Sequence, residues 1–404
     1  MRFLRATILG LFALAATGCM RYTSSPVDPS VALRSSRPPA GPIPYEAAVR
    51  WAIEHNPELR ALAWRADAAA WSPASEPVEI GAGRGSDTRS EAGLSLDALS
   101  LLGLGTRRAE VALACARRDE SWMAFHERAR AIAGEIAEWY AVDAALAEMP
   151  PYPAVGIDVR AFVNAGLDAP ASEAAALATE SDVRTENAER ATQRRAVRSA
   201  VARLLGLGDA TLELAPTATN WPAMPKIAPE TLATTRIDVQ RRLASFEVAD
   251  RALRRSVAGQ WPGLVLGPQV ALDPTTLFGT VKLRIPVGAG REVRAAESVR
   301  EAARAEVEVA VLAALQDARD TSDRLAQAER LTVAARTRFD ASTRLGDATR
   351  VRLSVAGGSV TETLFAQDAV LASAKALREA LVNEARARAR AAVANGWPSP
   401  LAAP

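Results

Sequence analysis

The sequence predicts an α+β protein made of two internal repeats, each with a pair of short strands followed by long helices. Two markers recur about 190 residues apart: Trp71-Ser-Pro73 is matched by Trp261-Pro262, and Leu205-Gly206 by Asn395-Gly396. Repetition on this scale indicates two copies of one supersecondary unit. Between the markers, each half contains an alternating strand pair, a Gly-Arg junction and two helices rich in Ala, Arg and Glu.

The first nineteen residues predict export from the cytoplasm. Arg2 and Arg5 precede an apolar segment, residues 6–16, that is too short to span a bilayer as a helix. The following Ala16-Thr17-Gly18-Cys19 resembles the lipobox of bacterial lipoproteins, so we expect cleavage to leave Cys19 as an acylated N-terminus. An ordinary signal peptide with an incidental cysteine is the alternative. Acylation would strengthen membrane attachment without requiring a membrane-spanning segment.

Composition favours a helix-rich protein without a polyanionic partner. The formal net charge is +2, so nucleic acid is not an expected partner. Aromatic residues make up 5% of the chain, and the apolar content comes mainly from Ala, Leu and Val, which suits closely packed long helices. The cysteines are Cys19 and Cys115. Acylation of Cys19 would preclude an intrachain disulfide, and we expect Cys115 to be buried on a helix.

Two segments alternate strictly between apolar and polar residues. In residues 92–99 the polar positions are Ser95 and Asp97, and in residues 280–285 they include Lys282 and Arg284. Such alternation predicts a strand with one face in an apolar medium and the other in water. Solvent-exposed hairpins on a soluble domain would satisfy the same pattern.

The partner strands are expected at residues 78–85 and 264–271. Pro268 in the second of these predicts a bulge or a strand end, because proline cannot donate to a ladder. Four strands cannot close a barrel, and open sheet edges are not tolerated in lipid. If these strands enter a bilayer, several copies of the chain must therefore share one barrel.

The remaining sequence predicts unusually long helices. Residues 291–345 contain neither Gly nor Pro, which allows a helix of roughly 80 Å at 1.5 Å per residue. Residues 171–205 and 359–395 are expected to form further long helices. In residues 106–149, apolar residues alternate at spacings of four and three, the pattern of a coiled-coil seam; they are Phe125, Ala129, Ile132, Ile136 and Trp139.

No motif in the sequence predicts catalysis, a metal site or a bound cofactor. His55 and His126 are the only histidines, and His126-Glu127 lacks a second histidine at metal-binding spacing. Gly103-x-Gly105 precedes a helix but lacks the rest of a phosphate-binding loop. The many carboxylates on arginine-rich helices are expected to form surface ion pairs.

The order of several motifs resembles the TolC family of bacterial outer-membrane efflux proteins, particularly its lipoprotein members. The resemblance covers roughly residues 45–396 and rests on the order and duplication of the motifs rather than on any one of them. The matching segments are Tyr45-Glu46-Ala47-Ala48 with Asn56-Pro57-Glu58-Leu59, Leu102 to Arg108, Ala165-Gly166-Leu167, Arg236-Ile237-Asp238-Val239, Ile285-Pro286-Val287 with Gly290-Arg291, and Gly357-Gly358-Ser359-Val360.

The resemblance implies a homotrimer in the outer membrane. Each chain of such a protein gives four strands to a twelve-stranded β-barrel, and its helices continue the barrel as an α-helical coiled-coil tunnel into the periplasm. The conduit works with an inner-membrane pump and a periplasmic adaptor that docks at the helix tips. The tip positions here are Gly166, Leu167, Gly357 and Gly358, and the candidates for the lumen-facing side of the strands are Ser95, Asp97, Lys282 and Arg284.

The domain organisation that follows has six segments. They are a signal peptide at 1–18, an acylated tether at 19–44, a first repeat at 45–208, a connecting equatorial segment at 209–235, a second repeat at 236–396 and a tail at 397–404. Outer-membrane lipid is an expected partner.

The sequence departs from the family pattern in three places. Met149-Pro150-Pro151-Tyr152-Pro153 interrupts the first long helix, so we expect a shortened or kinked first helical hairpin. The positions aligned with the acidic constriction of some relatives are Thr363 and Ala366, so that gate is not expected here. The strands are also short for a bilayer. Two other classes remain open: a periplasmic adaptor lipoprotein, and a lipid-anchored structural protein of the envelope.

Overall fold

The fold is given by a computed structural model. It describes residues 41–70, 78–84, 90–97, 106–149, 152, 170–207, 212–215, 231, 235–261, 263–272, 275–284, 289–355 and 357–396. The predictions for Cys19, Gly166 and Leu167 lie outside these residues, as do the proposed signal peptide, residues 19–40 of the proposed tether and the C-terminal tail.

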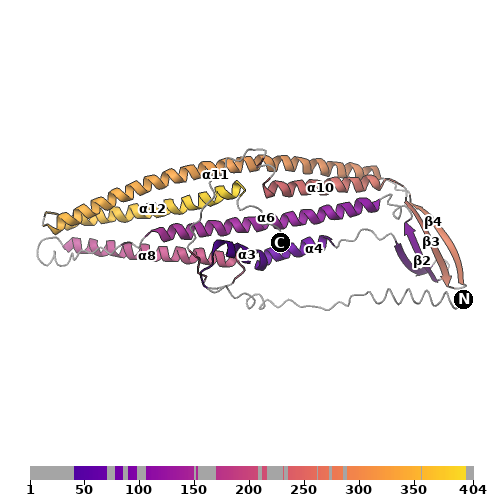
Figure 1. Ribbon diagram of the computed structural model, residues 1–404, viewed down its shortest axis with the longest axis horizontal. Coiled ribbons are helices and arrows are strands. Elements are labelled where there is room, and N and C mark those ends of the chain that lie inside the picture. The colour runs from indigo at the N-terminus through magenta and orange to yellow at the C-terminus, as the bar shows by residue number, and fades with distance from the viewer. Residues whose placement is uncertain are drawn as a thin grey trace. The chain divides into compact units, whose positions relative to one another are not determined.

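In the part of the chain that the structure describes, seven helices and four strands follow one another, and a strand pair followed by long helices occurs twice (Figure 1). The first half contains α3 (Tyr45–His55), α4 (Pro57–Ala70), β1 (Val78–Arg84), β2 (Ser90–Asp97), α6 (Thr106–Glu148) and α8 (Pro170–Leu204). The second half contains α10 (Ile237–Ala258), β3 (Gly263–Leu272), β4 (Thr275–Arg284), α11 (Ala289–Ser354) and α12 (Val360–Ala394). None of the described helices is apolar over a stretch sufficient to cross a membrane.

The break between α3 and α4 falls where Asn56-Pro57 predicts it. The Asn56 Oδ1 atom accepts hydrogen bonds from the backbone N–H groups of Glu58 (2.8 Å) and Leu59 (3.2 Å), so Asn56 caps α4. Its side-chain amide donates to the carbonyl oxygen of Leu204 at 2.8 Å. One buried side chain therefore starts α4 and ties it to the end of α8.

The longest helix packs through small residues. The helix α11 has 66 residues, which corresponds to roughly 100 Å at 1.5 Å per residue. It lies beside α12 and α10 (Figure 1). Its buried positions include small residues at multiples of seven, the interval of a coiled coil: Ala314, Thr321, Ala328, Ser342 and Thr349. Small side chains allow the helix axes to approach closely, which explains the high alanine content of these helices.

The main apolar core lies where α3, α4, α6 and α8 meet. The predicted seam of α6 contributes Ala129, Ile132 and Ile136, all buried, while Phe125 and Trp139 pack against it from its margin. The Tyr140 hydroxyl donates to the carbonyl oxygen of Ile43 at 2.7 Å, and Ile43 forms a parallel bridge with Leu214. The coiled-coil prediction for α6 is confirmed.

The helix α6 ends at Glu148, at the proline-rich interruption. It has 43 residues, against 66 in α11. The predicted interruption of the first long helix is therefore confirmed, while the shortened or kinked hairpin expected beyond it falls outside the described residues.

The prediction for Cys115 is wrong, because this residue is exposed. The buried positions in this part of α6 are Leu113 and Ala116. These two residues, three apart, define the buried face, and Cys115 lies about 100° around the helix from Ala116.

The four strands form one antiparallel sheet in the order β1-β2-β3-β4. The β1–β2 and β3–β4 pairs are hairpins, as expected, and β2 joins them by pairing with β3. The strands have 7, 8, 10 and 10 residues. Within this sheet β1 and β4 each pair on one side only.

Pro268 neither ends β3 nor introduces a bulge, which corrects the sequence prediction. The strand continues through Pro268, whose partner on β4 is Gly279. On the other side, pairing with β2 stops after Gly93↔Gln269 and resumes in the same register at Leu96↔Leu266. The missing proline N–H thus interrupts one ladder locally without shifting it.

The register assigns the sheet positions to two faces of different composition. Across adjacent strands, Asp97 is opposite Val265, and Val265 is opposite Lys282. Since successive residues alternate between faces, Ser95 and Arg284 belong to the same face as these positions. The other face contains the apolar positions Ile80, Leu94, Leu96, Leu264, Leu266, Val270, Leu277, Val281 and Leu283.

Replacing Asn56 with Ala should lower the free energy of unfolding by about 2 kcal/mol, because a helix cap is lost and the Leu204 carbonyl loses its donor. Asn56→Asp keeps the cap acceptor but cannot donate to Leu204, so its cost should be about 1 kcal/mol. Urea unfolding followed by circular dichroism measures both. Equal costs for the two variants would show that the amide donor contributes nothing.

Candidate functional site: the helix tip and the polar seam behind it

The turn between α11 and α12 is a compact tip that depends on glycine. The backbone N–H of Gly357 donates to the carbonyl oxygen of Arg352 at 3.1 Å, which folds the chain back onto the end of α11. A Cβ atom on Gly358 would lie 2.9 Å from the Leu353 nitrogen, whereas one on Gly357 would meet nothing closer than 3.9 Å. Ser359 then caps α12, its Oγ accepting from the Thr361 N–H at 3.1 Å. Gly358 therefore permits the close return of the chain.

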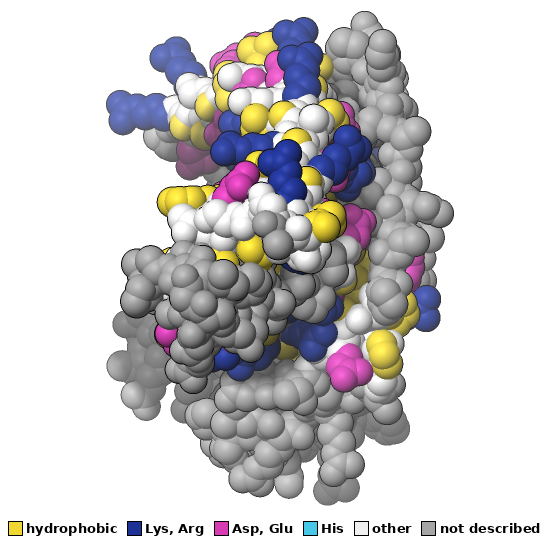
Figure 2. All heavy atoms as spheres, turned by 90° about the vertical axis from the view of Figure 1, so that its left-hand side faces the viewer, with side chains coloured by type: hydrophobic (Ala, Val, Ile, Leu, Met, Phe, Trp, Pro, Cys, Tyr) yellow, Lys and Arg dark blue, Asp and Glu magenta, His cyan; other side chains and the backbone are white. Residues whose placement is uncertain are grey.

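The surface next to this tip combines exposed apolar and basic side chains. Val351, Val355 and Phe365 are 62%, 74% and 72% exposed. Figure 2 shows hydrophobic and basic side chains intermingled over the described part of this end. Arg352 contributes one of these charges and lies 3.8 Å from Glu362. Apolar side chains exposed beside charges are typical of a protein-binding surface.

Thr363 and Ala366, the two positions at which the sequence resemblance would have placed an acidic constriction, are buried in the protein. Thr363 is fully buried and donates to the Ser359 carbonyl oxygen at 3.1 Å, and Ala366 is buried beside it. The exposed neighbour is Phe365. Neither position presents a carboxylate.

Behind the tip, α8 and α12 are joined by polar contacts at regular intervals, which we call the polar seam. Its first contacts are Ser172 to Thr361, with 3.3 Å between the hydroxyl oxygens, and Thr179 Oγ1 to Asp368 Oδ1 at 2.7 Å. In both contacts the partners are 189 residues apart, close to the spacing on which the repeat prediction rests. Because the residue numbers rise together on both helices, α8 and α12 run parallel.

The third contact of the polar seam is a buried ion cluster. The Glu186 side chain is 0% exposed and accepts from Arg378, whose side chain is 7% exposed. The Lys375 Nζ atom lies 3.6 Å from the second Glu186 oxygen. Removing a charge from water is costly unless it is paired, so this carboxylate depends on both cations.

The sequence did not identify the polar seam as a site. Glu186 and Arg378 belong to helices whose carboxylates were expected to form surface ion pairs, and this pair is buried instead. The sequence does contain a pattern that could have predicted the polar seam. Polar residues recur every seven positions on both helices: Ser172, Thr179 and Glu186 on α8, and Thr361, Asp368 and Lys375 on α12. Seven-residue spacing places such residues along one side of a coiled coil.

The other predicted site residues fall in different parts of the chain. Gly357 and Gly358 form the described tip, while their proposed counterparts Gly166 and Leu167 are not described. Ser95, Asp97, Lys282 and Arg284 occupy positions on one face of the sheet. Their orientation toward a lumen remains a prediction.

The described residues offer little for catalysis. They contain no group of three or more His, Cys, Asp or Glu residues that could hold a metal ion. His126 lies against Trp122 and Phe125, and burial lowers the pKa of its imidazole. His55 stacks on Trp51 with 4.0 Å between ring centroids. Each of the two histidine rings therefore packs against at least one aromatic side chain.

The structure is similar to solved outer-membrane channels. It matches MtrE of Neisseria gonorrhoeae at a TM-score of 0.70 and 16% sequence identity, over 87% of this chain and 88% of that one. It matches CmeC of Campylobacter jejuni at 0.70 and 14%, over 87% and 85% of the two chains. For VceC of Vibrio cholerae the values are 0.64 and 15%, over 87% and 96%.

The chain thus has the fold of TolC-type outer-membrane channels, the fold that the resemblance in the sequence predicts. No family model matches the sequence, and comparison with curated proteins gives no match. The matches cover most of each channel chain, so the likeness extends well beyond a single helical hairpin.

Replacing Arg378 with Met should lower the free energy of unfolding by about 3 kcal/mol, because it leaves Glu186 buried with only Lys375 nearby. The double variant Glu186→Gln with Arg378→Met removes both charges and should cost less than the single one. Urea unfolding of the three proteins tests this. A double variant less stable than Arg378→Met would contradict the argument.

Gly358→Ala should loosen the tip, because its Cβ would collide with the backbone of Leu353. We expect amide hydrogen exchange in residues 353–362 to become at least about tenfold faster, equivalent to about 1.4 kcal/mol. Gly357→Ala is the matched control and should leave exchange unchanged. Equal exchange in both variants would remove the steric role of Gly358.

Proposed function

We propose that this protein is the outer-membrane channel of a tripartite efflux system, a passive conduit through which substrates leave the periplasm or an inner-membrane pump for the exterior. Membership of the TolC family is part of this proposal. It is supported by the fold, which is shared with MtrE and CmeC, both described as outer-membrane channels. A conduit needs no catalytic residues, so we assign the protein no enzymatic activity.

The observation that carries the proposal is the two-faced sheet with two open edges. One face collects most of the apolar positions of the four strands, and the other contains Ser95, Asp97, Lys282 and Arg284. A sheet in lipid must pair all its edges. Because β1 and β4 each have one partner among the described strands, further copies would supply the second. Three copies would close a twelve-stranded barrel with a polar interior.

The strand lengths fit this role better than the sequence indicated. The strands β3 and β4 each have ten residues, within the roughly 9–11 that a tilted strand needs to span a bilayer. The shorter β1 and β2 have 7 and 8 described residues. The second hairpin is thus the stronger membrane-spanning candidate.

The tip of α11 and α12 is the proposed docking surface for a periplasmic adaptor. Its exposed Val351, Val355 and Phe365 would be covered by the partner, and the close turn at Gly358 would let the two backbones approach. Gly166 and Leu167 would provide the equivalent tip of the first repeat. Acylated Cys19 would anchor the same chain in the outer membrane.

Purified protein should form trimers in detergent and conduct ions in planar bilayers. Lys282→Gln together with Arg284→Gln should shift the permeability ratio toward cations, because two positive charges leave the pore wall. Leu283→Ile, at a neighbouring position on the other face, is the matched control and should leave selectivity unchanged.

The same experiment separates the alternatives. A periplasmic adaptor or a structural envelope lipoprotein would give no conductance. A conducting trimer whose selectivity ignores Lys282 and Arg284 would keep the channel and refute the lumen assignment of these two residues.

A further inference from the structure

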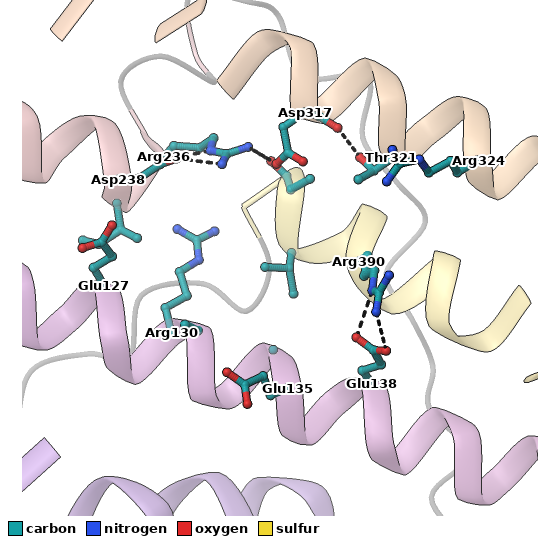
Figure 3. Close-up of a pocket in the computed structure, with 15 residues that line it drawn as sticks. Glu127, Arg130, Glu135, Glu138, Arg236, Asp238, Asp317, Thr321, Arg324 and Arg390 are labelled. Carbon is teal, nitrogen blue, oxygen red and sulfur yellow. Dashed lines mark hydrogen bonds and ion pairs between the residues drawn. The ribbon is translucent and has the colours of Figure 1, made fainter. Parts of the chain in front are cut away.

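We propose that a cavity between α6, α10, α11 and α12 binds a small organic anion through Arg130. This inference goes beyond the proposed conduit and does not depend on it. The cavity has a volume of about 400 Å³, enough for a small molecule. Figure 3 shows its walls, with α6 on one side and the start of α10, the middle of α11 and the end of α12 around it.

All five carboxylates that line the cavity are already engaged by arginines. Arg236 holds two of them, Asp238 at 2.7 Å and Asp317 at 2.8 Å. The remaining pairs are Glu127 with Arg241, Glu135 with Arg128 and Glu138 with Arg390. These pairs leave little negative charge for a metal or an organic cation, so the cavity favours a ligand of the opposite sign.

Arg130 is the exception among the charged groups that reach into the cavity interior. Its Nη2 atom is buried and has no hydrogen-bond partner. In Figure 3 its guanidinium points from α6 toward the start of α10, and no dashed line reaches it. Burial and the positive charge of Arg236 both lower the pKa of Arg130, and Asp238 opposes them. A buried donor left unsatisfied is costly, so the structure favours an acceptor here.

Arg236 cannot satisfy the Nη2 donor of Arg130, because a guanidinium has donors but no acceptor. Its Nε and Nη2 atoms donate to Asp238, and its Nη1 atom donates to Asp317 and lies 3.3 Å from the carbonyl oxygen of Ala394. Arg236 therefore joins the start of α10 to the end of α12, and Asp238 and Asp317 offset its charge. A carboxylate or phosphate in the cavity would pair with Arg130, whose Nη2 atom has no partner.

Two further features point to an anion. The N-terminus of α10, where partial positive charge accumulates, lines the cavity through Ile237. Its N-cap residue makes no side-chain cap, and Asp238 accepts from the Val239 N–H at 3.0 Å. Arg324 on α11 also lines the cavity and is exposed. Apolar groups complete the walls, among them Ala131, Ile237 and Val393. The fitting ligand is thus an oxyanion with an apolar body, either a carboxylate or a phosphate ester.

The test is calorimetric titration of the full-length protein in detergent with benzoate, phenyl phosphate and inorganic phosphate, at constant ionic strength in chloride. We expect benzoate or phenyl phosphate to bind more tightly than inorganic phosphate. Arg130→Gln should weaken this binding tenfold or more, because the charge-assisted hydrogen bonds are lost. Comparison of the two organic probes distinguishes a carboxylate from a phosphate ligand.

Two more variants keep the test decisive. Arg338→Gln, an exposed α11 arginine that does not line the cavity, is the matched control and should bind as the wild type does. Arg324→Gln should weaken binding at the exposed cavity wall even if Arg130→Gln does not fold. Absence of binding to the wild-type protein, or equal binding by the wild type and a folded Arg130→Gln variant, overturns the proposal. Conductance is measured in a separate experiment, so the absence of anion binding would not contradict the channel proposal.

Discussion

Close packing of small side chains between long helices is the constraint on which this structure depends. The buried positions of α11 include Ala314, Thr321, Ala328, Ser342 and Thr349, seven residues apart or a multiple of seven. A few large side chains cannot hold long helices together, because a helix in a protein gains most of its stability from packing one continuous face against its neighbours. Small residues repeated on one face give that continuity along α11 from Ala314 to Thr349. It also explains why 5% aromatic residues suffice.

Helix faces made only of small residues would allow the helices to slide past one another, and polar contacts between the helices prevent this. Two contacts of the polar seam between α8 and α12 share an offset of 189 residues, and its deepest contact joins Glu186 to Arg378. Arg236 fixes a second junction by holding α10, α11 and α12 together. Displacing α8 against α12 by one turn would leave the buried charge of Glu186 unpaired, which costs far more than a lost apolar contact.

The sheet imposes a different requirement from the helices. Its register concentrates apolar positions on one face and leaves β1 and β4 with free outer edges. Helices satisfy their backbone hydrogen bonds internally, but strands do so only through neighbours. The helical part can therefore be complete within one chain, whereas the sheet needs other copies before it can enter lipid. This asymmetry is the physical basis for the proposed oligomeric channel.

The sequence by itself determined the helices, the break at Asn56-Pro57, the end of α6 and the hairpins, because periodicity and proline act locally. It also predicted the TolC-type fold through the order of its motifs. Only the tertiary structure decided what depends on distant partners. The strand continues through Pro268 because β3 pairs with β2 and β4 on either side. The packing of neighbouring helices leaves Cys115 exposed and buries Glu186. Arg130 likewise looks ordinary in the sequence, since its lack of a partner depends on four helices meeting around it.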